Sequence, residues 1–171
     1  RRSSDLRWER MRKDLGLQQM QFVLPGNISF LRMHAPDEFG DPLQDLRVML
    51  QEAERTLTPQ SGFETGRAYA GVRGAVPVTV TTENTAKFIG TLELGITFDG
   101  YIARLSKQTG VGFGILLKPD AVTKAMWEEY RPSGSQPSRN HCCYLLAASK
   151  GELGEWLDSG KLPPYHNTFS A

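Results

Sequence analysis

The chain has 171 residues, of which 39% are hydrophobic and 23% are charged, as is usual for a globular domain with a full core. Its net charge of +1 gives no electrostatic basis for binding nucleic acid, because that needs a strongly basic face. No apolar run approaches the roughly 20 residues that a membrane-spanning helix needs. The sequence starts at Arg1 and has no signal-peptide pattern, so we expect a fragment excised from a longer protein.

The first segment is basic and carries a narrow apolar stripe at helical spacing, which predicts a helix that stops at Gly16. The stripe consists of Trp8, Met11 and Leu15. Such a helix either docks on the rest of the chain or extends away from it. Because the stripe is narrow, we predict a stalk over residues 1–16 and a folded core over residues 17–171.

Two short strand-like runs follow, Gln19 to Leu24 and Ile28 to His34, and they are separated by the turn signal Pro25-Gly26-Asn27. Strict alternation in the second run predicts that Ile28, Phe30, Arg32 and His34 share one face.

The next segment has the pattern of an amphipathic helix. Asp41 suits the N-cap, Pro42 the first helical position and Gln44 the third. The apolar stripe then continues to Leu57, two residues before Pro59, so we predict that the helix ends there. We expect a loop from Thr58 to Gly62.

The stretch from Glu64 to Phe98 predicts an antiparallel hairpin with a polar turn from Thr81 to Lys87. One face of its first strand carries apolar side chains suited to a core: Ala70, Val72, Val76 and Val78. The opposite face carries Arg67, Tyr69 and Arg73. Burying an unpaired guanidinium is costly, so we interpret this second face as a recognition surface.

The remaining patterns predict further helices and strands without a regular β-α-β alternation. They are a helix from Asp99 to Gly110, a strand from Val111 to Lys118, a helix opening at Pro119 with Val122, Met126 and Tyr130 as its stripe, a strand from His141 to Ala148, a short helix from Glu152 to Asp158 and a last strand from Tyr165 to Phe169. Helices inserted between antiparallel strands indicate an α+β fold with one central sheet.

The cysteine and histidine pattern gives no support to an enzyme or a metal site. Cys142 and Cys143 are adjacent, and neighbouring residues of a strand point to opposite faces, so a mutual bond would be strained. For the same reason His141 is poorly placed to activate Cys142. The three histidines have no ligand spacing, so we predict no catalytic residue and no metal.

Several blocks of the sequence resemble one known family. They are Leu31-Arg32-Met33-His34-Ala35-Pro36, Phe39-Gly40-Asp41, Gly62-Phe63-Glu64-Thr65-Gly66-Arg67, Gly71-Val72-Arg73-Gly74-Ala75-Val76-Pro77-Val78 and Ile89-Gly90-Thr91-Leu92-Glu93-Leu94-Gly95. The combination resembles the extracytoplasmic sensor domains of bacterial transmembrane receptors, which are Cache-type, PAS-like domains of the double sensory subgroup. This subgroup is found in chemotaxis transducers, histidine kinases and diguanylate cyclases.

The resemblance implies a periplasmic sensor domain of an inner-membrane receptor, most simply a chemotaxis transducer. Such a domain binds a small ligand, here an anionic metabolite such as an organic acid, works as a homodimer and signals through its membrane-proximal helix. Some relatives attach haem through a Cys-x-x-Cys-His motif, which this sequence lacks, so we predict no cofactor. The alternatives are a sensor of a kinase or cyclase, and a ligand-free module for dimerisation or partner binding.

Five residues are our candidates for contacting the ligand: Arg73, Arg32, His34, Tyr69 and Arg67. Each guanidinium could hold a carboxylate through paired hydrogen bonds, and Tyr69 could line the pocket. Each has a structural alternative. Arg73 would pair with Glu93 or Glu64, and His34 would cap its strand or bond Asp37.

Overall fold

The computed structural model describes residues 2–82, 85–131, 143–153, 155 and 159. The chain forms two compact units, one comprising Arg1–Gly66 with Ala70–Thr97, the other Arg67–Tyr69 with Phe98–Ala171. The fold is α+β, as predicted. One sensor domain over residues 1–171 stays a prediction.

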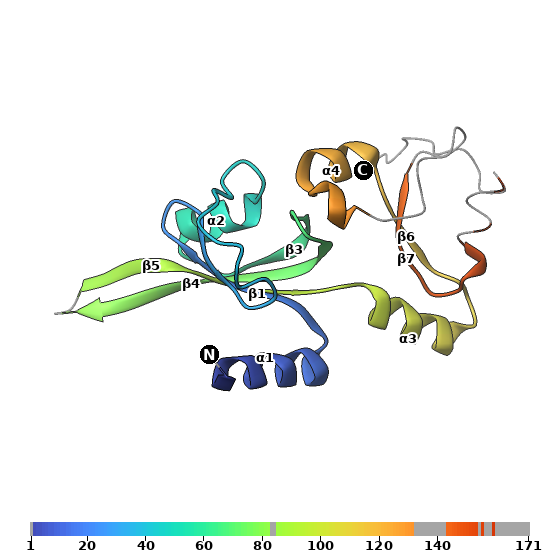
Figure 1. Cartoon of the computed structure of the whole chain (residues 1–171), viewed down its shortest axis with the longest axis horizontal. Helices are drawn as coiled ribbons and strands as arrows, with labels where there is room; N and C mark the ends of the chain where they lie inside the picture. Colours follow the sequence, from blue (N-terminus) through green and yellow to red (C-terminus); the bar gives the residue numbers. More distant parts are fainter. Residues whose placement is uncertain (1, 83–84, 132–142, 154, 156–158, 160–171) are drawn as a thin grey trace. The chain divides into compact units, whose positions relative to one another are not determined.

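Unit 1 is built on a five-stranded antiparallel sheet in the order β2-β1-β5-β4-β3 (Figure 1). The strands are β1 (Leu17–Leu24), β2 (Ile28–Arg32), β3 (Gln60–Thr65), β4 (Ala70–Thr82) and β5 (Thr85–Ile96). The predicted turn at 25–27 and the central hairpin are confirmed. Two details were wrong: β3 takes most of the expected loop, and β4 and β5 extend into the expected polar turn.

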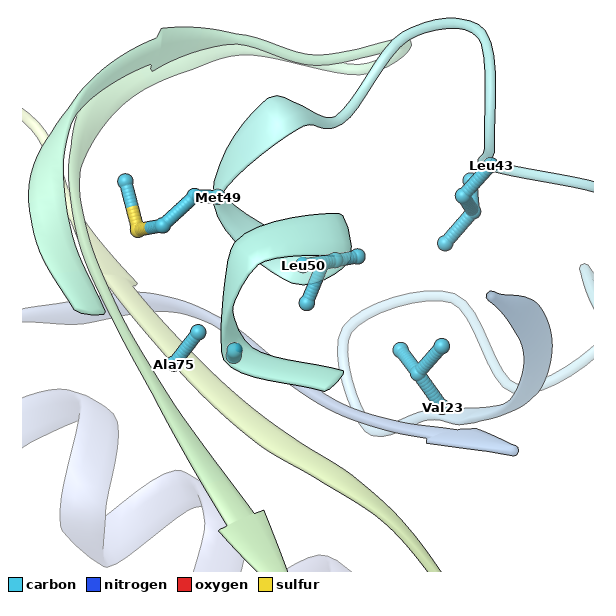
Figure 2. Packing of buried hydrophobic residues seen from close by; sticks show 6 residues of the cluster. Val23, Leu43, Met49, Leu50 and Ala75 are labelled. Carbon is cyan, nitrogen blue, oxygen red and sulfur yellow. The ribbon is translucent and has the colours of Figure 1, made fainter. Parts of the chain in front are cut away.

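Ala70 is buried as predicted, but further along β4 the two faces are the reverse of the prediction. Arg73 and Ala75 are buried, whereas Val76 is 48% exposed. Ala75 is buried because α2 (Val48–Thr56) packs its apolar stripe on the side of the sheet that carries it. Figure 2 shows the resulting core. It consists of Val23, Leu43, Met49, Leu50, Ala53 and Ala75.

The helix α2 begins seven residues later than Asp41. Asp41 does not cap it, because its carboxylate pairs with Arg32 and its carbonyl accepts the backbone N–H of Ser29 at 3.0 Å. Pro42 lies in an isolated antiparallel bridge with Ile28. The segment that reads as a first helical turn therefore runs along the edge of β2.

The stalk prediction is also contradicted within unit 1. The helix α1 (Arg2–Leu15) lies against β1, and the side chain of Trp8 is only 5% exposed. Figure 1 draws α1 and α2 on opposite sides of the five-stranded sheet. Trp8 is a large apolar side chain, so a narrow stripe is sufficient for docking.

Unit 2 contains α3 (Asp99–Thr109), β6 (Gly114–Leu117), α4 (Pro119–Ala125), a 3₁₀ turn η1 (Glu128–Tyr130) and β7 (Tyr144–Ala148). Its strands form a second antiparallel sheet, β6-β7, where we had expected a single central sheet. The helix end at Gly110 and the start at Pro119 are confirmed, but Tyr130 lies beyond the end of α4.

Cys143 is buried and disulfide-bonded, contrary to the expectation of an unbonded pair. His141 and Cys142 lie outside the described residues, as do the predicted last strand and much of the helix from Glu152 to Asp158.

Candidate functional site

A network of buried polar side chains lies between α2 and the sheet of unit 1. At its centre Glu93 of β5, 0% exposed, faces Arg73 of β4, 2% exposed, with 3.5 Å between the guanidinium Nη1 and the carboxylate Oε1. Gln19 of β1 accepts a hydrogen bond from Arg73 at 2.6 Å and donates one to Glu93 at 2.8 Å. A second donor, Gln21, lies 2.5 Å from the same carboxylate.

Strand register explains why these side chains meet. Gln21 is opposite Glu93, Glu93 is opposite Ala75, and all three positions project to the α2 side. Gln19 and Arg73 flank Gly95 in the neighbouring row of the sheet, and Gly95 has no side chain to separate them. The pairing of Arg73 with Glu93 is the structural alternative considered above. The role of Arg73 in binding a ligand stays a prediction.

Arg47 extends the network to the start of α2. Its guanidinium donates to Glu93 through Nη2 and to Glu64 of β3 through Nε, the latter at 2.8 Å. The second oxygen of Glu64 accepts the backbone N–H of Met49 at 2.7 Å. Because α2 has no side-chain cap of its own, Glu64 supplies one from the sheet. The charges of Arg47 and Arg73 balance those of Glu64 and Glu93.

Arg32 is buried in a separate pair at the edge of β2. Its two terminal nitrogens lie 2.7 and 2.9 Å from the two carboxylate oxygens of Asp41, the paired geometry that suits a guanidinium. It also donates to the carbonyl of Glu38 at 2.7 Å. The pairing fastens the loop that precedes α2 onto β2.

His34 follows β2 and is half-buried, with Nδ1 3.4 Å from the carbonyl oxygen of Met20. Burial, together with the positive charges of Arg32 and Arg73, lowers the pKa of His34 to about 4, and the hydrogen bond to Met20 opposes this shift. The imidazole is therefore neutral near pH 7. The structural alternatives for His34 were a cap on its strand or a bond to Asp37, and the contact seen is with the carbonyl of Met20.

The predicted face of β2 is broken by a β-bulge. The register between β1 and β2 shifts between Phe22 and Val23, so alternation does not run through the strand. Phe30 is exposed whereas Arg32 is buried, although simple alternation gives them one face.

Arg67 and Tyr69 belong to unit 2. The guanidinium carbon of Arg67 lies 5.6 Å from the ring centre of Trp127, close enough for a cation–π contact. The carbonyl of Arg67 accepts the backbone N–H of Trp127 at 2.9 Å. Trp127 in turn lies 6.0 Å from Tyr130 between ring centres. Tyr69 is half-buried in the same short segment as Arg67.

The structure thus brings three of the five candidates, Arg32, His34 and Arg73, into one electrostatic neighbourhood of unit 1, and places Arg67 and Tyr69 in unit 2. Sequence reasoning missed Arg47, Gln19 and Gln21. A signal existed in β1, where both glutamines fall in the same alternation as the buried Leu17 and Val23.

Among the described residues, no group of three or more histidine, cysteine or acidic side chains is arranged to hold a metal ion. Over the same residues, no helix is long and apolar enough to cross a membrane. The network in unit 1 has balanced charges and hydrogen-bonded carboxylates, an arrangement that fixes α2 in place.

A comparison with protein families matches residues 1–140 to the dCache_3 family model, described as a double sensory domain of two-component sensor kinase. A search of curated proteins finds no match.

Proposed function

Because this chain belongs to the double Cache sensory domains of two-component sensor kinases, we propose that it is the extracytoplasmic ligand-binding part of a transmembrane receptor. The family match over residues 1–140 is the observation that carries the proposal. Cache domains of this kind are typically the external parts of membrane sensors. In a bacterium with two membranes this location is the periplasm.

The ligand we propose is a small organic acid. An arginine is the side chain best suited to hold a carboxylate, because its planar fork makes two charge-assisted hydrogen bonds at once. Three of the candidate residues are arginines, and their surroundings differ. Arg73 faces Glu93 and Arg32 faces Asp41, so an incoming carboxylate would have to compete with an internal one at either position.

We propose Arg67 as the anchor for the acid group because it contacts the ring of Trp127 and shares a segment with Tyr69. Its guanidinium makes a cation–π contact with the indole of Trp127, and this contact holds the side chain beside the ring. Tyr69, two residues away, adds a ring and a hydroxyl to the same segment. The segment Arg67–Tyr69 with Trp127 is our candidate ligand-binding region.

A thermal-shift screen of small organic acids, amino acids and amines identifies a ligand, and calorimetry then compares variants. Arg67→Ala should weaken binding of the best acid about tenfold to a hundredfold, since it removes a charge-assisted contact worth about 1.5–3 kcal/mol. Arg67→Lys should restore only part of the affinity because a lysine presents a single point charge.

Arg73→Ala is the matched control. It should lower the melting temperature of the ligand-free protein, because Glu93 loses a partner, and leave the affinity per folded molecule unchanged. If Arg73→Ala abolishes binding and Arg67→Ala does not, the anchor is in unit 1. If no compound in the screen shifts the melting temperature, the ligand-free module becomes the better description.

For the output, the sequence resemblance points to a chemotaxis transducer, whereas the description of the matched family names two-component sensor kinases. A histidine kinase is therefore our second candidate, and a cyclase the third. In each case we propose that ligand binding favours one of two existing arrangements of a homodimer. Fusing residues 1–171 to the transmembrane helices and kinase of a known sensor, and measuring phosphorylation against ligand concentration, tests this coupling.

A further inference from the structure

The side of the unit 1 sheet that faces away from α2 carries an exposed apolar surface. Phe22 is opposite Leu92 and Leu92 is opposite Val76, so these positions share the side that does not carry Glu93 and Ala75. Five apolar side chains of this part of the sheet are between 42% and 59% exposed: Leu24, Phe30, Val76, Val80 and Ile89. We call them the open face.

The open face is mainly apolar, although Lys87 lies opposite Val80 in the sheet. A groove of about 320 Å³ runs through it, lined by Phe22, Leu24, Phe30, Val78 and Ile89 with the backbone of Val23, Gly90 and Thr91. No residue of that lining carries an ionisable side chain. The helix α1 docks on the sheet through Trp8 and leaves the five side chains exposed.

The size of the open face fits the centre of a protein interface. Side chains of this size expose on the order of 150–200 Å² each when free, so half-exposure of five gives on the order of 400 Å² of apolar surface. A standard interface covers about 800 Å² on each partner, of which somewhat more than half is apolar. The open face therefore supplies the apolar share of one standard interface.

We propose that the open face is the surface through which a second copy of this chain binds. A two-fold dimer places the same patch against itself, so the patch has to be complementary to its own copy. The groove in the open face, whose lining carries no ionisable side chain, meets this condition without like-charge repulsion. The inference rests on the proposed function only in that the receptor works as a homodimer.

A dimer through the open face places the partner on β1, β2, β4 and β5. It does not use the apolar stripe of α1, because Trp8 of that stripe is buried within unit 1. The second copy would cover Val76 and Ile89 near the centre and leave α2, on the other side of the sheet, untouched.

Sedimentation equilibrium of the whole chain without ligand tests the proposal. The wild type should form a dimer at micromolar to submillimolar concentrations, and Val76→Glu should raise the dimer dissociation constant at least tenfold, because it brings two carboxylates together in an apolar interface. Val48→Glu is the matched control, since Val48 is 66% exposed on α2 and the substitution is the same. The control should leave the dissociation constant unchanged. Ile89→Lys is a second variant in case Val76→Glu fails to melt cooperatively.

A wild type that stays monomeric up to about 1 mM overturns the proposal, as does a dimer that Val76→Glu and Ile89→Lys leave intact. A dimer disrupted by Val48→Glu alone assigns the interface to the other side of the sheet and equally overturns it. The measurement uses no ligand, so failure here leaves the Arg67 anchor standing, and failure of the ligand screen leaves the open face standing.

Discussion

His34 gives the folded protein a specific dependence on pH. Its folded pKa of about 4 lies below the ordinary value of 6.5, so the unfolded chain takes up the proton first as the pH falls. The stability that His34 contributes is fully present above pH 6.5 and is lost as the pH falls from there through 4. Because the side chain is only half-buried, we expect a contribution of about 1–2 kcal/mol, less than the full shift would give.

The variant His34→Asn tests this, since its amide can still donate to the carbonyl of Met20 but does not titrate. Urea unfolding of both proteins at pH 7.5, 5.5 and 4 should show the wild type losing more stability than the variant. Parallel curves for the two proteins would mean that His34 has the same pKa folded and unfolded.

The pairing of Arg73 with Glu93 could be anticipated from the sequence. That Arg73 lies on the buried side of β4 could not. Alternation alone assigned Arg73 to an outer surface because a charged side chain seldom lies in a core without a partner. The partners that permit its burial, Glu93 and Gln19, come from strands far away in the sequence, and only the register of the sheet brings them together.

The end of α2 carries a conformational cost that a single substitution can remove. Leu57 adopts the left-handed conformation, with φ 53° and ψ 30°, and its N–H bonds to the carbonyl of Ala53. A residue with a Cβ pays about 1–2 kcal/mol for this conformation, whereas glycine adopts it freely. Leu57 is more than half exposed, so little packing is lost. We expect Leu57→Gly to stabilise the protein by about 0.5–1 kcal/mol after the added freedom of the unfolded chain is counted.

The neighbouring position provides the contrast. Thr56 is the last residue of α2, and Thr56→Gly should destabilise the protein by about 0.5–1 kcal/mol. Chemical denaturation of the two variants should therefore give changes of opposite sign. The same sign for both would mean that the left-handed conformation at Leu57 costs nothing.

Element boundaries show where local rules are sufficient. The helix from Asp99 ends at Gly110 and the next begins at Pro119, as their local signals predict, although the N-cap of the first is Phe98 and not Asp99. The prediction that α2 starts at Asp41 was wrong because the carboxylate of Asp41 pairs with Arg32. A charge-assisted pair is stronger than a helix cap. Bulges are equally invisible to alternation, which is why the predicted face of β2 was wrong.

At the scale of unit 1, the charge network joins α2 to β1, β3, β4 and β5. Glu93→Gln removes the carboxylate that both Arg47 and Arg73 face, leaving two buried positive charges with one remaining negative charge. Breaking a buried pair from one side typically costs about 3–5 kcal/mol, and we expect a loss of that order. Urea unfolding measures it.

A double-mutant cycle distinguishes a network from separate contacts. The variant Glu93→Gln/Arg73→Gln should be more stable than the sum of its single variants implies, because the second change removes a charge that the first left unpaired. Glu52→Gln, which disrupts an exposed pair with Arg55 on α2, should have no measurable effect. Strict additivity of Glu93→Gln and Arg73→Gln would show that the two side chains act independently.

The division of the chain between the two units has a consequence for synthesis on the ribosome. All of unit 1 has been made once Thr97 is added. The segment Arg67–Tyr69, between β3 and β4, belongs to unit 2 and bonds to Trp127, which is added 30 residues after Thr97. At roughly 5–20 residues per second this interval is about 2–6 seconds, far longer than a hairpin needs to form. The strands of unit 1 can therefore pair first, holding Arg67–Tyr69 as an open loop until Trp127 emerges. A nascent chain arrested before Trp127 would display that loop to proteases, and a longer chain with Trp127 past the tunnel exit would begin to protect it.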